Sequence, residues 1–242
     1  AGRLVLGLGS QVKPHIERRF SMPWYAAARQ MREFIEAMNA IFECWYDGDR
    51  LDFEGEYYRH NLMPSTFRPD NIEAGRPRIT LSATGPLMTR VAAEVADGMI
   101  MHPFSSEKYI REVTLPAIDK GLANSGRTLA DFELDYAPII ATGIDEESLA
   151  RSIATARDRI AFYGSTPAYA PVLGVHGWGD LQPELNKLSK QGLWDDMANL
   201  ITDEILAEFA VVGEPEAAVD LFKGRFGNVV DRTMGNFVGK DE

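Results

Sequence analysis

Short apolar runs alternate with amphipathic helical segments about five times along this 242-residue chain. This alternation constrains the fold, because strands that are separated by helices pair in parallel and need helices to cover the sheet. Parallel strands are predicted near residues 3–8, 78–82, 98–102, 133–141 and 229–235. The sequence therefore predicts an α/β fold in which the loops that follow the strands gather at one face.

The segments between these runs supply the helices. A long amphipathic helix is expected from Trp24 to about Tyr46, opened by Pro23 and ended by the sequence DGD. Asp145 is placed to cap a later helix, and Pro116 is placed to kink another. The remaining helices are expected over 106–126, 145–164, 182–209 and 213–227, with a hairpin over 51–60 and an irregular aromatic loop over 165–181.

The length of the chain limits how this pattern can close. A complete β/α barrel needs eight βα units in roughly 250 residues or more. Here the predicted chain is a single domain over 1–242, and five βα units with two insertions, near residues 48–77 and 164–181, already take up its full length. Either the apolar pattern does not reveal every strand, or the chain corresponds to the later part of a barrel.

Composition excludes several classes of protein. The formal net charge is −11, which argues against nucleic-acid and anionic-membrane partners. The single cysteine, Cys44, leaves no disulfide framework and no cysteine-based zinc site. We find no secretory signal and no apolar run long enough to span a bilayer, so a soluble cytoplasmic protein is expected.

The absence of familiar catalytic motifs narrows the chemistry. The sequence holds no GxGxxG, P-loop, HExxH or GxSxG motif, and its four histidines show no metal-ligand spacing. Hydrolysis by a metal or a serine nucleophile is therefore disfavoured, and no metal site is predicted. A barrel with an anion site but no nucleophile suits an enzyme whose chemistry belongs to a bound cofactor.

The turn Ser82-Ala83-Thr84-Gly85-Pro86 is the first candidate site. It joins a predicted strand to a helix, whose first N–H groups are unpaired and whose dipole favours an anion. Small residues let a phosphate approach, Thr84 adds a hydroxyl, and Pro86 fits the first helical turn. The alternative is a tight turn that needs glycine for packing, and the motif alone favours this alternative.

Loops after two other strands carry further candidates. Gly9, Ser10 and Gln11 follow the first strand, and His15 in the same polar loop could donate a hydrogen bond or act as a general acid or base. An exposed loop histidine is more often idle. His102 follows the third strand and faces a similar choice between catalysis and packing. A last group, Tyr163, Tyr169, His176 and Trp178, reads either as a lid over a flat ring or as a packing cluster.

Four segments of the sequence together resemble the luciferase-like monooxygenase superfamily, and more closely its coenzyme F420-dependent oxidoreductase branch. They are RLVLGLGSQVKPHIERRFSMPW, SATGPLMTRVAAEVADGMIMHPF, IAFYGSTPAYAPVLGVHGWGDL and FAVVGEPEAAVDLFKGRFGNVVDRT. The resemblance covers nearly the whole chain. It implies a TIM-barrel-like (β/α) fold with insertions, and a start at what would be the fourth strand, without the first three βα units.

The resemblance also implies a function. Members bind a flavin or deazaflavin whose phosphate lies near the loops after the fourth and fifth strands. Carried over to this chain, the cofactor-binding residues are Gly9, Ser10, Gln11, Thr84, Gly85, Pro86 and Met88. The expected activity is hydride transfer between F420 and a small organic substrate, or monooxygenation with FMN, in a homodimer. The alternative is a shortened, catalytically silent barrel that only binds a phosphorylated ligand or a partner subunit.

Overall fold

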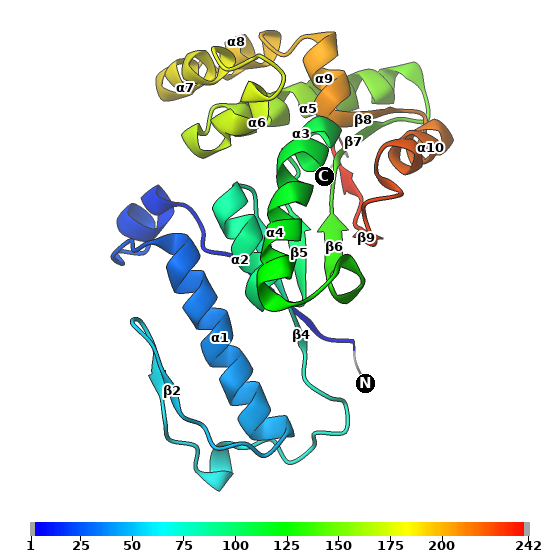
Figure 1. The fold of residues 1–242 in the computed structure, drawn as a ribbon. Coiled ribbons are helices and arrows are strands. Elements are labelled where there is room, and N and C mark those ends of the chain that lie inside the picture. Colours follow the sequence, from blue (N-terminus) through cyan, green and yellow to red (C-terminus); the bar gives the residue numbers. More distant parts are fainter. Residues whose placement is uncertain (1–2, 240–242) are drawn as a thin grey trace. The chain divides into compact units, whose positions relative to one another are not determined.

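The computed structural model describes residues 3–239, which fall into two compact units (Figure 1). The first unit comprises residues 3–83, 87–100 and 117–132. The second unit comprises residues 84–86, 101–116 and 133–239. The chain passes between the units several times, so each unit combines segments that are distant in the sequence.

The first unit contains parallel strands, as the alternating pattern predicts. β1 (Val5–Leu8) pairs in parallel with β4 (Arg78–Ala83), and Leu8 lies opposite Leu81. β4 is also hydrogen-bonded to β5 (Gly98–Met101). The apolar side chains of β4 are buried, and the backbone of this strand pairs with a neighbour on each side. The helices of this part are α1 (Ala27–Tyr46), α2 (Pro86–Val95), α4 (Leu115–Ser125) and the short turns η1 (His15–Arg19), η2 (Ser65–Phe67) and η4 (Leu129–Asp131).

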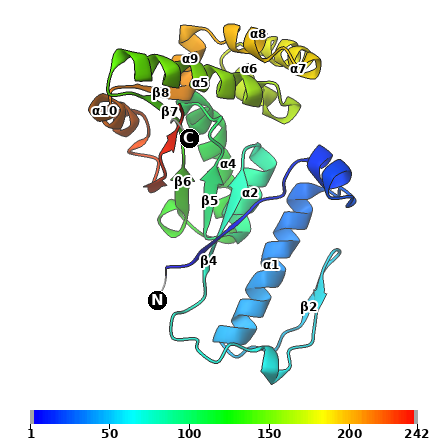
Figure 2. The same cartoon turned by 180° about the vertical axis from the view of Figure 1, so that it is seen from behind.

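A short hairpin lies beside α1 in both views of the molecule (Figures 1 and 2). Its strands β2 (Phe53–Glu54) and β3 (Arg59–His60) are antiparallel, which confirms the predicted hairpin. The carboxylate of Glu33 on α1 accepts three backbone N–H groups of the connecting turn, at 2.9, 2.6 and 2.6 Å. These charge-assisted hydrogen bonds fasten the hairpin to the helix.

The second unit contains two sets of parallel strands. β6 (Glu133–Tyr136) pairs with β9 (Arg232–Thr233), while β7 (Ile139–Thr142) lies between β8 (Ala210–Gly213) and β10 (Asn236–Phe237). Its helical segments are α3 (Glu107–Tyr109), η3 (Ile110–Thr114), α5 (Glu146–Gly164), η5 (Pro167–Tyr169), α6 (Ala170–Gly174), α7 (Leu181–Gln191), α8 (Trp194–Asn199), α9 (Asp203–Phe209) and α10 (Pro215–Phe226). Parallel strands connected by helices confirm the predicted α/β fold.

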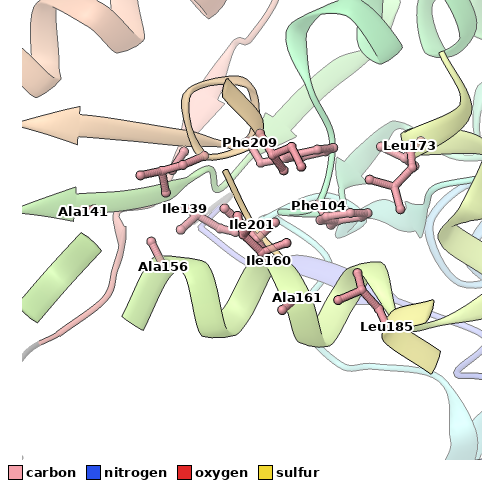
Figure 3. Close-up of a cluster of buried hydrophobic side chains, with 14 of the residues drawn as sticks. Phe104, Ile139, Ala141, Ala156, Ile160, Ala161, Leu173, Leu185, Ile201 and Phe209 are labelled. Carbon is pink, nitrogen blue, oxygen red and sulfur yellow. The ribbon is translucent and has the colours of Figure 1, made fainter. Parts of the chain in front are cut away.

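A cluster of buried apolar side chains holds the second unit together (Figure 3). Phe104 and Phe209 stack face to face, with ring centroids 4.3 Å apart and planes 6° from parallel. Ile139 of β7 and Ile160 of α5 are fully buried in the same cluster. This core therefore packs α5 and α9 on the three-stranded sheet, while α7 and α8 pack on α5.

Polar side chains fix the ends of the helices in this unit. The Asp145 side chain accepts the Ser148 N–H at 2.7 Å, which confirms the predicted cap of α5. Gly192 ends α7 in the left-handed conformation, at φ 73°, so the helix expected over 182–209 is divided into α7, α8 and α9. Arg225 donates to three carbonyl oxygens at the end of α9, those of Ala207, Glu208 and Ala210, and so caps that helix.

Several boundaries differ from the sequence-based expectations. The strand expected over 133–141 is two strands, because Pro138 has no N–H to donate and interrupts the ladder. The strand expected over 229–235 is reduced to the two-residue β9, with β10 following it. β8 was not among the predicted strands. The first long helix begins at Ala27, four residues after Pro23.

Two helical predictions also need correction. The loop expected over 165–181 is partly helical, since η5 and α6 occupy residues 167–174. The helix expected over 106–126 is interrupted by the π-helical turn η3, which immediately precedes α4. Pro116 lies inside this continuous helical segment, directly after the first residue of α4, and the wider π-helical turn before it accommodates the ring.

Candidate functional site

The loops after β1 and β4 start at the same edge of the sheet, because the two strands are parallel and in register. Gly9 lies close to β4, since a Cβ added to it would be 3.6 Å from the Ser82 Cβ. The Ser10 hydroxyl donates to the Gln11 carbonyl at 3.1 Å, and Gln11 has a positive φ of 58°. Such a conformation is strained for a residue with a side chain and is often found at functional sites.

His15 belongs to the same loop. Its ring is exposed, and its Nδ1 lies 3.1 Å from the Gln11 side-chain oxygen. The structure thus brings together four residues that the sequence singles out, Gly9, Ser10, Gln11 and His15. Met88 also lies in the first unit, half-buried on the third residue of α2.

The turn Thr84-Gly85-Pro86 leads directly into α2, whose first residue is Pro86. Gly85 does not have a positive φ, and a Cβ added to it would meet no heavy atom within 4 Å beyond its chain neighbours. Neither backbone conformation nor packing within the described residues requires glycine here. The packing explanation for Gly85 therefore finds no support, and a phosphate site at this helix N-terminus stays a prediction.

A buried tyrosine holds the carbonyl of this turn. The Tyr109 hydroxyl donates to the Thr84 carbonyl oxygen at 3.1 Å, and its side chain is almost wholly buried. Tyr109 is not marked by any pattern in the sequence, because its partner lies 25 residues earlier and no local pattern links them. The only signal in its surroundings is Ser106, which caps α3 by accepting the Tyr109 N–H at 3.1 Å.

His102 follows β5 and lies among aromatic rings of the second unit. Its ring lies edge-on to that of Tyr163, with centroids 4.8 Å apart, and tilted to that of Tyr169, at 4.5 Å. Nδ1 accepts the Phe104 N–H at 3.0 Å, so the neutral ring carries its proton on Nε2. That proton is donated to the Tyr169 hydroxyl at 3.1 Å.

Burial lowers the pKa of His102 from its ordinary value of 6.5 to about 4. The ring is therefore neutral at pH 7, and both of its nitrogens are engaged in hydrogen bonds. This arrangement suits a fixed orientation better than proton exchange at neutral pH. A catalytic role for His102 remains a prediction.

The other aromatic residues of the 163–178 segment pack on the core. Trp178 stacks on His176, with centroids 4.6 Å apart, and both rings approach Phe209. His176 Nε2 lies 2.7 Å from the Ser106 hydroxyl, and burial lowers the pKa of His176. Since Ser106 is completely buried, this pair is a structural contact and not an exposed nucleophile. The packing interpretation of Trp178 is supported.

A cavity of about 340 Å³ adjoins the Ser10 loop within the first unit. Its walls come from the end of β1, the loop before α1, the exposed start of α1 and the hairpin. The lining is mainly apolar, and its residues include Ser10, Trp24, Tyr25, Gln30, Phe34 and Tyr58. A cavity of this size and character can take a small organic group.

Residues 3–239 show neither a metal-binding cluster nor a membrane-spanning helix. No group of three or more His, Cys, Asp or Glu side chains there is arranged to hold a metal ion. Within the same residues, no helix combines the length and the apolar character that crossing a membrane requires.

Solved structures share this fold. The coenzyme F420-dependent tetrahydromethanopterin reductase from Methanopyrus kandleri superposes with a TM-score of 0.76 at 21% sequence identity. The match covers 99% of this chain and 70% of the reductase chain. The fold is therefore that of the TIM-barrel-like α/β proteins of this type.

Proteins of similar sequence include reductases of the same kind. An uncharacterized protein of Mycobacterium tuberculosis is 48% identical over 241 residues, which is 100% of this chain and 71% of the relative. The 5,10-methylenetetrahydromethanopterin reductase of Archaeoglobus fulgidus is 30% identical over 227 residues, covering 90% of this chain and 63% of the reductase. The family model for luciferase-like monooxygenases matches residues 1–232. The chain therefore belongs to the luciferase-like monooxygenase family.

Proposed function

We propose that the chain is a flavin- or deazaflavin-dependent oxidoreductase that acts on a small organic substrate, with F420 as its cofactor and FMN as the alternative. The observation that carries this proposal is the open turn at Gly85. A glycine that neither conformation nor packing requires leaves the backbone accessible at the start of a ten-residue helix. That is the arrangement that favours a phosphate.

The residues of the chain would hold a cofactor in two ways. The unpaired N–H groups at the start of α2 and the Thr84 hydroxyl would bind the phosphate. Within the first unit, Ser10 and the strained backbone at Gln11 would present polar groups to a bound ligand. The bound ring would supply the redox chemistry, by hydride transfer in a deazaflavin or by reaction with oxygen in a flavin.

The apolar cavity beside Ser10 is proposed as the place for the organic substrate. Its aromatic walls offer an apolar surface, and Gln30 and Tyr58, whose amide and hydroxyl are 3.2 Å apart, give it a polar end. His15 is exposed in the loop that borders this cavity, and we propose it as the proton donor or acceptor.

Two candidate functions compete with F420-dependent hydride transfer. Monooxygenation with FMN is favoured by the family model, whose description is luciferase-like monooxygenase. A catalytically silent barrel that only binds a phosphorylated ligand is favoured by His102. Both nitrogens of its ring are occupied by hydrogen bonds, so this histidine is not free to transfer a proton to a substrate. Turnover by a chain that has been shown to bind a cofactor separates enzyme from binder.

The test of the proposed phosphate site is Gly85→Asp. The new carboxylate would occupy the space meant for the negatively charged phosphate, so we expect the affinity for F420 and FMN to fall about tenfold or more. The measurement is retention of the visible absorption band after desalting, followed by titration. Gly179→Asp is the matched control, because Gly179 also has open space around it and no positive φ.

Thermal unfolding without cofactor separates folding from binding. The proposal holds if Gly85→Asp unfolds at the same temperature as Gly179→Asp but binds cofactor more weakly. If both variants bind F420 and FMN as tightly as the parent, the turn does not bind phosphate.

We further propose that the protein self-associates. In the second unit, a cavity of about 400 Å³ lies between α10 and the strands β7 and β10. Its lining is apolar, and Val219 and Phe237 remain about half exposed there. β10 is an edge strand of its sheet. Apolar surface beside a strand edge favours association with a second copy.

Light scattering over a wide concentration range tests this association. We expect a dimer for the parent and a weaker dimer for Val219→Glu, which places a charge at the cavity. Leu221→Glu is the control. Leu221 is an exposed apolar residue of the same helix, α10, but it does not line this cavity. A parent that stays monomeric at every concentration would refute the proposal.

A further inference from the structure

We propose that Tyr109 is a positioning residue of the phosphate site, because its hydroxyl fixes the orientation of the Thr84–Gly85 peptide. This inference rests on the proposed function, since it concerns how that turn is held ready for an anion. Tyr109 would not touch the phosphate. It would act through the backbone that does.

The contact lies within the second unit. The Tyr109 hydroxyl donates to the Thr84 carbonyl oxygen at 3.1 Å, and the side chain is 1% exposed. Burial also raises the pKa of Tyr109, so the hydroxyl keeps its proton and remains a donor. The Ser106 cap at the start of α3 holds the Tyr109 backbone, with Ser106 Oγ 3.1 Å from the Tyr109 nitrogen. The donor is therefore held by its ring and by its backbone.

The geometry of a peptide links this contact to the opposite side of the turn. The peptide bonds of the described residues are all trans, so the carbonyl of Thr84 and the N–H of Gly85 point in opposite directions. When the carbonyl is held by Tyr109, the Gly85 N–H points away from Tyr109. A hydrogen bond to one end of the peptide thus sets the direction of the donor at the other end.

The Thr84–Gly85 peptide needs the hydrogen bond from Tyr109 because a glycine follows it. Gly85 has no side chain, and its surroundings would not restrain one, so rotation of the preceding peptide meets little steric resistance. A rotated peptide would turn the Thr84 carbonyl toward an incoming phosphate, where two negative groups repel each other. The Tyr109 hydroxyl disfavours that state, and so prepares the turn before the ligand arrives.

Tyr109→Phe tests the inference, because it keeps the buried ring and removes only the hydroxyl. The probes are FMN and riboflavin, which share a ring and differ by the phosphate, and, as a second pair, F420 and the deazaflavin whose ribityl chain lacks the phosphate-linked tail. Binding is measured by titration of the ring fluorescence with the whole 242-residue chain. The decisive quantity is the ratio of the two affinities within each pair, because a general loss of structure lowers both.

Ser152→Ala is the matched control. It also removes a buried hydroxyl that donates to a backbone carbonyl of the second unit, that of Thr142 at 2.8 Å. We expect Tyr109→Phe to lower the preference for the phosphorylated ligand by about three- to tenfold, as the loss of one neutral hydrogen bond implies. We expect Ser152→Ala to leave that preference unchanged.

The outcomes separate the inference from the proposed site. If the parent prefers the phosphorylated ligands and Tyr109→Phe prefers them as strongly, the positioning role is wrong while the phosphate site stands. If Ser152→Ala lowers the preference equally, the effect is a general loosening and the positioning role is again wrong. If the parent shows no preference in either pair, the phosphate site itself is wrong and the role of Tyr109 falls with it.

Discussion

Phe209→Ala is expected to lower the free energy of unfolding by about 3–5 kcal/mol, the range for removing a buried phenylalanine from a core. Phe209 is 2% exposed at the last residue of α9, and its ring stacks on that of Phe104 at 4.3 Å. The rings of His176 and Trp178 also approach it, at 5.9 and 6.4 Å. Alanine would leave a cavity at the point where α9 meets the rest of the core, and a loss of this size is a large part of the stability of an ordinary domain.

Urea unfolding followed by circular dichroism measures the change. Phe162→Ala is the control, because Phe162 is 54% exposed on α5 and its ring has a neighbour in Trp194 at 6.4 Å. The control should cost about 1 kcal/mol or less. Equal losses of unfolding free energy in the two variants would mean that the stack of Phe104 and Phe209 contributes no more to stability than a surface contact does.

The parts of the fold that follow strong local signals could be predicted from the sequence. β1 and β4 are apolar runs that end in small residues, and the cap of α5 is an aspartate with a serine three residues later. β8 could not be predicted in this way. α9 ends at Phe209 and β8 begins at Ala210, with no glycine or proline between them, so the apolar run reads as the continuation of a helix.

In the candidate site, too, features with a local sequence signal could be predicted and contacts between distant residues could not. The turn at Gly85-Pro86 is visible in the sequence, because glycine and proline mark a strand-to-helix connection. The bond from Tyr109 to Thr84 spans 25 residues, and the contact between Ser106 and His176 spans 70. Such pairs follow from the packing of whole elements, and a single sequence carries no local pattern for them. The same holds for the neutral state of His102, which depends on burial by rings that come from a distant segment.

His102 should make the protein less stable as the pH falls from about 6.5 to about 4. Its pKa is lowered by burial from 6.5 to about 4, so the unfolded chain takes up a proton in this range before the folded chain does. Well above pH 6.5 neither state is protonated and the stability is fully present. The loss reaches about 1.4 kcal/mol per pH unit only in the middle of the window, so the total loss between pH 6.5 and 4 should be about 2–3 kcal/mol. In the same window, protonation of Nδ1 would break the hydrogen bond from the Phe104 N–H.

The measurement is the free energy of urea unfolding at a series of pH values for the parent and for His102→Asn. Asparagine can still accept the Phe104 N–H with its side-chain oxygen but does not titrate, so its curve retains only the contribution of other groups. Those groups include His176, whose pKa burial also lowers and which is unchanged in both proteins. The difference between the two curves should therefore grow as the pH falls and level off near pH 4. Parallel curves would show that the His102 ring is protonated as easily in the folded state as in the unfolded one, and that its contacts with Tyr163 and Tyr169 do not keep it neutral.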